Sequence, residues 1–254
     1  MKLSIITAVH NSKETIEDCL KSVASQTYAD VEHIIIDGGS TDGSKQLIEG
    51  ISQKEKRKSI KFISEKDNGI YDALNKGIKM SSGDVIGLLH ADDLFADNNV
   101  IHKIQELLDD KAFDGVYSDL IYVSKNDTNK IIRIWKTGEY KTLNYGWMPP
   151  HPTLFLRREV FDKIGFYDST FKIASDYDFI LRLFKDRFYN LKYLPEITIK
   201  MRLGGKSNKS LKNILSKSIE DYKAATKNNL PFPLCTIFCK NFRKFSQIIH
   251  KNFL

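Results

Sequence analysis

Residues 3–109 alternate between short apolar runs and longer segments in which apolar residues recur every three or four positions. The short runs predict strands, and the three- or four-residue spacing predicts helices. The expected order is strand then helix, four times over, at residues 3–8, 12–26, 31–37, 44–52, 60–64, 69–80, 84–90 and 98–109. Because strands separated by helices need crossover connections, this order predicts a doubly wound, mostly parallel α/β sheet.

The runs SIIT, HIII and VIGLL show little polar alternation, which is typical of central strands buried on both faces. Asn11, with Glu14 three residues later, resembles a capping box that opens the first helix. Beyond residue 113, Tyr- and Ile-rich runs at 115–123 and 131–135 flank a polar loop. This change of pattern predicts a hairpin and an α+β second half.

We expect one domain at residues 1–210, with halves at 1–112 and 113–210, followed by an extension at 211–254. Charge supports this division. The formal net charge is +7, but residues 200–254 hold twelve Lys and Arg and two acids, so that segment carries +10 and the rest carries −3. The basic character therefore belongs to the C-terminal segment alone.

Three cysteines without metal-site spacing, together with the absence of a signal-peptide pattern, predict a cytoplasmic protein. Apolar runs are far shorter than the ~20 residues of a membrane-spanning helix. Any contact with a membrane is therefore expected to be peripheral.

Acidic residues follow three of the predicted strands, at the position where doubly wound sheets bind their ligands. They occur in DGGSTDGS after the second strand, EKDNG after the third and HADD after the fourth. Each segment alone is also a common turn or helix-capping sequence. Turn chemistry does not require all three to be acidic, so together they predict a site for a divalent cation and a diphosphate.

These segments together resemble the GT-A-fold glycosyltransferases of family two. The motifs occur in family order over residues 1–205: SIITAVHN, IIIDGGSTDGS, EKDNGIYDALNKGI, HADD and ASDYDFILRL. The segment MPPHPTLFLRREVFDKIGFYD before ASDYDF is similar to bacterial enzymes that build surface polysaccharides. The resemblance implies a nucleotide-sugar-binding half at 1–112 and an acceptor half at 113–210.

The resemblance also implies residue roles. Thr7 and Ala8 would line the nucleotide pocket, Asp37 would bind the base, usually uracil, and Asp67 with Gly69 would contact the nucleoside. Asp93, with Asp92 beside it, would hold Mg²⁺ or Mn²⁺ against the diphosphate. Asp176 would be the catalytic base of an inverting transfer.

Asp178 is the rival for the role of base, two residues after Asp176 in a predicted helix at 176–185. The family ordinarily has Glu-Asp where this chain has Ser175-Asp176, so one neighbouring acid is missing here. An acid at a helix start can also simply complement the helix dipole.

Further candidates would contact the acceptor or close over the donor. Trp147 and His151 stand on a proline-rich segment that could line the acceptor site. Arg202 and Lys206 belong to a predicted Gly-rich basic loop suited to close over phosphates. A structural histidine and a plain surface turn are the alternatives.

The C-terminal extension contains an apolar stripe at helical spacing, with basic residues on the opposite face. The stripe consists of Leu234, Phe238, Phe242, Phe245, Ile249 and Phe253, and the basic residues are Lys240, Arg243, Lys244 and Lys251. This pattern is typical of a helix on an anionic membrane surface. The alternative is a helix docked on its own domain or at a homodimer interface.

The favoured function is transfer of one sugar from a nucleoside-diphosphate sugar, most often a UDP-sugar, to a saccharide or polyisoprenyl-diphosphate-linked saccharide. A Gln-x-x-Arg-Trp motif, typical of processive synthases, is missing. The alternatives are a sugar nucleotidyltransferase, although its Gly-rich signature is absent, and a nucleic-acid-binding module that uses the basic tail. The second leaves the acidic rim unexplained, so we expect no nucleic-acid partner.

Overall fold

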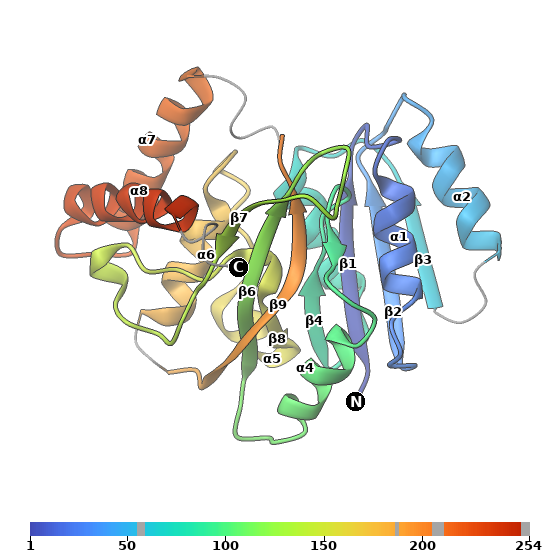
Figure 1. Cartoon of the computed structure of the whole chain (residues 1–254), viewed down its shortest axis with the longest axis horizontal. Coiled ribbons are helices and arrows are strands. Elements are labelled where there is room, and N and C mark those ends of the chain that lie inside the picture. The colour runs from blue at the N-terminus through green and yellow to red at the C-terminus, as the bar shows by residue number, and fades with distance from the viewer. Residues whose placement is uncertain (55–58, 186–187, 205–210, 250–254) are drawn as a thin grey trace.

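The computed structural model describes residues 1–54, 59–185, 188–204 and 211–249. Its first half alternates strands and helices as expected (Figure 1). The elements are β1 (Leu3–Val9), α1 (Ile16–Ala24), β2 (Val31–Asp37), α2 (Ser44–Lys54), β3 (Ser59–Ser64), α3 (Ile70–Met80), β4 (Val85–Leu88) and α4 (Val100–Leu108). Strands β3, β2, β1 and β4 pair in that order and run parallel, which confirms the predicted topology of this half.

The sheet separates two apolar cores, because successive side chains of a strand point to opposite faces. In β1, Ile6 and Ala8 join the core that also contains α3 residues, whereas Ile5 and Val9 join the core under α1 and α4. All residues of β1 and β2 are buried. This burial explains why their sequences lack polar alternation.

The second half continues the same sheet with mixed strand directions. Its elements are β5 (Leu94–Phe95), β6 (Gly115–Val123), β7 (Ile131–Trp135), η1 (Leu143–Tyr145), η2 (His151–Thr153), β8 (Phe155–Arg157), α5 (Arg158–Ile164), α6 (Ser175–Phe184) and β9 (Leu191–Arg202). Strand β8 runs antiparallel to both β4 and β6, and thereby joins the two halves. The β6–β7 hairpin has the predicted bounds.

The predicted capping box at Asn11 and Glu14 is wrong. Helix α1 begins at Ile16, and the Asn11 side chain instead accepts a hydrogen bond from the Thr41 amide at 2.9 Å. Glu14 forms an ion pair with Lys125 at 2.7 Å. Both side chains therefore connect loops at the end of the sheet.

The C-terminal extension forms α7 (Leu211–Lys227) and α8 (Pro233–Ile249), which lie beside β7 and α6 (Figure 1). Lys240 was expected on an exposed basic face, and this expectation is wrong. Its side chain is 5% exposed, contacts Asp221 Oδ1 at 2.7 Å and lies 3.4 Å from the centre of the Tyr177 ring. Burial, together with the nearby Lys217, lowers the pKa of Lys240 to about 7, while Asp221 opposes this shift.

The apolar stripe of α8 faces away from this docked side. Leu234, Phe238 and Phe242 are 66–74% exposed. Phe245 and Ile249 belong to the helix, but the environment of their side chains, and of Lys244, is not described, and Phe253 and Lys251 lie outside the described residues. Within the described parts of the chain, no helix is both long and apolar enough to cross a bilayer.

Two glycines test how closely α8 is packed. Gly138 and Gly146 both have φ +69°, but a Cβ at Gly146 would lie 2.6 Å from Lys240 Cα, whereas one at Gly138 meets nothing within 4 Å. Each alanine substitution should cost about 1 kcal/mol from backbone strain. Gly146→Ala should cost about 1–3 kcal/mol more through overlap with α8, measured by urea unfolding. Equal losses for the two variants would contradict the close packing of α8.

Candidate active site

The acidic segments after β2 and β3 meet at the carboxyl end of the sheet. Asp37 ends β2 opposite Val9 of β1 and Ser64 of β3. Its buried carboxylate accepts hydrogen bonds from the Ser64 hydroxyl at 2.8 Å and the Ser40 amide at 3.1 Å. These contacts hold the DGGSTDGS loop against β3.

Asp67 lies directly over this loop. A Cβ added to Gly38 would lie 2.8 Å from the Asp67 carboxyl carbon, so glycine permits the close approach. The Asp67 carboxylate accepts a hydrogen bond from the Gly69 amide at 2.9 Å, and Gly69 has φ +115°. Asp67 is only half-buried, which leaves it open toward a ligand above the loop.

The Thr7 side chain lies inside the sheet. It is fully buried, and its hydroxyl pairs with His33 Nε2 at 2.9 Å. Ala8 is 8% exposed. The Thr7 hydroxyl is thus used for packing β1 against β2 rather than presented at the sheet edge.

Asp92 and Asp93 follow β4 and lie beside the last residue of β9. The Asp93 carboxylate accepts a hydrogen bond from the Arg202 amide at 3.2 Å, and the Arg202 guanidinium donates to the Asp92 carbonyl at 3.1 Å and to Asp18 at 2.5 Å. Asp93 is 1% exposed. Burial and the neighbouring charge of Asp92 raise the pKa of Asp93 well above its usual range.

This pair fits a divalent cation. Asp93 Oδ2 is buried and has no hydrogen-bond partner among the described residues, which is costly for a carboxylate oxygen. Among the described residues, no group of three or more His, Cys, Asp or Glu side chains is placed to hold a metal ion. Mg²⁺ commonly takes one or two carboxylates and completes its shell with water and substrate phosphates, so two neighbouring carboxylates are compatible with such an ion.

Asp176 lies at the start of α6, where both halves of the chain meet. Its carboxylate contacts His151 Nδ1 at 3.2 Å and the Tyr71 hydroxyl at 3.4 Å, and its side chain is 22% exposed. Burial raises the pKa of Asp176, but the hydrogen bond and charge of His151, with Lys217 and Lys240 farther away, bring it below its ordinary value. The carboxylate is therefore ionised and partly open to solvent.

His151 also connects Asp176 to the Asp92–Asp93 segment. His151 Nε2 lies 2.5 Å from His90 Nε2, and the Asp93 amide donates to the His90 carbonyl at 3.0 Å. Burial, with the nearby His151, lowers the pKa of His90 to about 3, so His90 is neutral. Because His151 Nδ1 faces the Asp176 carboxylate, its Nε2 is free to share a hydrogen bond with His90 Nε2, in which one ring donates and the other accepts.

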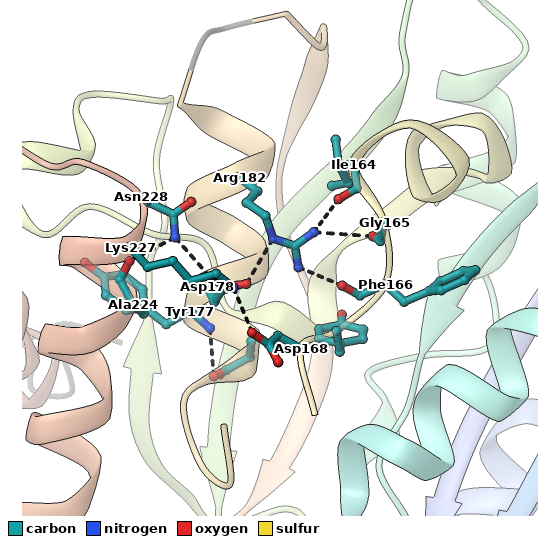
Figure 2. A network of polar contacts seen from close by, with 12 residues as sticks. Ile164, Gly165, Phe166, Asp168, Tyr177, Asp178, Arg182, Ala224, Lys227 and Asn228 are labelled. Carbon is teal, nitrogen blue, oxygen red and sulfur yellow. Dashed lines mark hydrogen bonds and ion pairs between the residues drawn. The ribbon is translucent and has the colours of Figure 1, made fainter. Parts of the chain in front are cut away.

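Asp178 has a structural environment instead. Figure 2 shows its carboxylate between Arg182 on the same helix and Lys227 and Asn228 at the end of α7, at 2.9, 3.2 and 3.0 Å. Asp178 is fully buried. Because the Asp178 carboxylate is buried and already bound by these three side chains, Asp176 is the better candidate for contact with a substrate.

The sequence of residues 4–177 matches the family model described as glycosyl transferase family 2. The chain belongs to glycosyl transferase family 2. Among curated proteins, a PGL/p-HBAD biosynthesis glycosyltransferase of Mycobacterium bovis is 28% identical over 81% of this chain and 78% of its own length. An uncharacterized glycosyltransferase of Mycobacterium tuberculosis is 34% identical over 71% and 68% of the two chains.

Solved structures share the fold of this glycosyltransferase. S. aureus TarS superposes with a TM-score of 0.67 at 16% identity, over 95% of this chain but only 44% of the TarS chain. The mannosyltransferase PcManGT of Pyrobaculum calidifontis, solved with GDP-Man and Mn²⁺, has a TM-score of 0.69 at 14% identity, over 95% and 69% of the two chains. These matches confirm the expected GT-A fold.

Two of the predicted acceptor or lid residues have other roles in this glycosyltransferase. Trp147 is 1% exposed, donates to the Thr137 carbonyl and packs against Tyr117 and Phe184, so its expected place in the acceptor site is wrong. Arg202 ends β9 and is buried beside Asp92 and Asp93, rather than in the predicted loop. Lys206 lies outside the described residues.

Sequence reasoning missed Tyr71 and the C-terminal lysines. Tyr71 stands within the recognised motif EKDNGIYDALNKGI, so its place beside Asp176 had a local signal. Lys217 and Lys240 had none, because helical periodicity does not reveal which face of a helix docks on a distant segment.

His151→Ala should raise the pKa of Asp176, because the hydrogen bond and charge of His151 are the main causes that lower this pKa, and burial, which raises it, remains. We expect a rise of at least about one unit, roughly 1.4 kcal/mol, measured by ¹³C NMR titration of the carboxyl group. A carboxyl group whose pKa is lower in the folded protein than in the unfolded chain stabilises the folded protein at any pH above its unfolded pKa, about 4. The stability advantage of wild type over His151→Ala should therefore be full at pH 7 and be lost progressively as the pH falls below about 4. An unchanged pKa in this variant, as expected for the exposed control His102→Ala, would contradict the assigned contact.

Proposed function

We propose that this glycosyltransferase moves one sugar, with inversion, from a nucleoside-diphosphate sugar to a saccharide or polyisoprenyl-diphosphate-linked saccharide acceptor in bacterial surface polysaccharide biosynthesis. The observation that carries the proposal is the ionised, partly exposed Asp176 carboxylate, joined through His151 and His90 to the Asp92–Asp93 segment. Such a site combines a proton acceptor with a cation site for a diphosphate.

A UDP-sugar is the favoured donor. Solved forms of TarS, a structural relative, contain UDP and UDP-GlcNAc, whereas PcManGT was solved with GDP-Man and Mn²⁺. In our proposal Asp37 and Asp67 bind the nucleoside, with the main chain of Thr7, Ala8 and Gly69 forming the walls. The half-buried Asp67 above Gly38 supports this placement.

The proposed reaction is a single displacement. The acceptor hydroxyl oxygen forms a bond to the anomeric carbon as the bond from that carbon to the diphosphate oxygen breaks, and the hydroxyl proton passes to Asp176. His151 keeps the Asp176 carboxylate ionised and oriented, and Tyr71 approaches its other oxygen. A Mg²⁺ or Mn²⁺ ion held by Asp92 and Asp93 would offset the negative charge that develops on the departing diphosphate.

The test is nucleotide release from a panel of UDP-, GDP- and dTDP-sugars, with and without Mn²⁺, for wild type and Asp176→Asn. We expect metal-dependent release from a UDP-sugar, and a kcat lower by about 10²–10⁴-fold in Asp176→Asn, because an amide cannot accept the proton. Nucleotide affinity in calorimetry should be unchanged. A variant as active as wild type would remove Asp176 from the reaction, and the absence of binding to all three nucleotides would exclude the proposed donor site.

We further propose that the protein works at the inner face of the cell membrane, with α7 and α8 against anionic lipid. Large apolar side chains are exposed at Leu215, Ile219, Tyr222, Phe232, Leu234, Phe238 and Phe242. Residues 200–254 carry a net charge of +10, which complements an anionic surface. Together they support insertion of apolar groups at the lipid interface.

Vesicle flotation tests this placement. Wild type should bind phosphatidylglycerol-containing vesicles, and the double variant Phe238→Ser, Phe242→Ser should bind at least about tenfold more weakly, because buried apolar area drives interfacial insertion. Phe188→Ser is the matched control, since Phe188 is 73% exposed but belongs to another part of the chain. Equal losses in both variants would contradict the proposal, as would a stable dimer whose interface covers Phe238 and Phe242.

A further inference from the structure

The segment before Asp176 has an unusual support. Three successive backbone amides, those of Lys172, Ile173 and Ala174, donate to the carboxylate of Glu220 on α7. The distances from nitrogen to oxygen are 3.2, 2.8 and 3.0 Å. A carboxylate that accepts several amide hydrogen bonds forms a strong, directional clamp.

This clamp stands at the point where α6 begins. Ala174 is the N-terminal cap residue of α6, and its side chain cannot accept a hydrogen bond from the exposed amides of the first turn. The hydroxyl of Ser175, the next residue, is buried without a hydrogen-bond partner in the described part of the chain. Glu220 therefore binds, from a distant helix, the backbone that leads into α6, at the helix end where negative charge is favourable.

The contacts made by Tyr71 fix the same segment from the opposite direction. Its hydroxyl donates to the Ile173 carbonyl at 2.6 Å and lies 3.4 Å from Asp176 Oδ1. Ile173 is thus held through its amide by Glu220 and through its carbonyl by Tyr71. Asp176 follows this segment after a single residue, Ser175.

Other contacts of the C-terminal helices lie on either side of Asp176 without reaching the segment itself. Lys227 contacts Asp168 at 2.7 Å and, with Asn228, the Asp178 carboxylate (Figure 2). Lys240 lies over the Tyr177 ring. Among the described contacts, those of Glu220 are the ones that α7 makes to the backbone directly before Asp176.

We propose that Glu220, outside the residues 4–177 that define the family match, is a positioning residue that sets the location of the Asp176 carboxylate against His151. The C-terminal helical extension is then part of the active-site framework, whether or not it also contacts a membrane. The consequence for turnover rests on the proposed role of Asp176, but the consequence for the geometry of Asp176 does not. Displacement of a reacting group by about 1 Å can lower a rate by about 100-fold.

Two variants and a control test this inference. Glu220→Ala removes all three acceptor contacts, whereas Glu220→Gln keeps one oxygen, which can still accept from the Ile173 and Ala174 amides but not also from Lys172. Lys223→Ala is the control, because Lys223 is an exposed charged residue on the same helix. Urea unfolding identifies any variant whose fold is compromised, and Glu220→Gln carries the test if Glu220→Ala does not fold.

The first readout needs no substrate. In Glu220→Ala the Asp176 carboxyl pKa, measured by ¹³C NMR, should rise toward the value in His151→Ala, because a displaced carboxylate loses its contact with His151. Glu220→Gln should lie between this variant and wild type, and Lys223→Ala should match wild type. An Asp176 pKa unchanged in folded Glu220→Ala would overturn the inference, even if the proposed reaction were wrong.

The second readout separates positioning from general damage. The kcat for nucleotide release should fall about 10–100-fold in Glu220→Ala, with UDP affinity within about twofold of wild type. In the Asp176→Asn background the same change should alter the residual rate by less than about twofold, because both residues act through one carboxylate. Equal losses in the two backgrounds, or a parallel loss of UDP affinity, would assign Glu220 a structural role only.

Discussion

The structure depends on the position of one carboxylate, that of Asp176, where segments far apart in sequence converge. Tyr71 reaches it from α3 of the first half and His151 from the turn before β8. Glu220 of α7 holds the backbone that leads to it. An ionised, partly buried carboxylate is stable only with such partners. The first half, the second half and the C-terminal helices each supply one of the residues that hold Asp176 or the backbone before it.

A second constraint comes from the acidic residues at the carboxyl end of the sheet. The Asp37 carboxylate accepts hydrogen bonds from the Ser40 amide and the Ser64 hydroxyl. The Asp178 carboxylate forms ion pairs with Arg182 and Lys227 and accepts a hydrogen bond from Asn228. The buried oxygen of Asp93 is not matched in this way by the described residues. The contrast marks the Asp93 oxygen as the one suited to meet a cation, and it agrees with the proposed transfer from a metal-bound diphosphate donor.

Local pattern was enough for much of the fold. Strand β2 and the β6–β7 hairpin have the predicted bounds, because buried strands and polar turns leave a periodic signal in the sequence. The motifs ASDYDFILRL and HADD also identified Asp176 and Asp93 as candidate site residues. Predictions from local pattern failed for side chains that bind a partner far away in the sequence. Arg202 pairs with Asp18, Lys240 pairs with Asp221, and Trp147 packs in an aromatic core. Such pairings depend on how helices and strands dock, which periodicity along the chain does not encode.

In the proposed enzyme, the Asp92–Asp93 segment and Asp176 border one donor site. A crystal structure of the protein with UDP and Mn²⁺, with the metal located by its anomalous scattering, would test this arrangement. We expect a Mn²⁺ peak between the Asp93 carboxylate and the diphosphate, with the uracil near Asp37 and Asp67 and the Asp176 carboxylate facing the open end of the diphosphate. A nucleotide bound elsewhere on the chain, or a metal peak remote from Asp93, would contradict it.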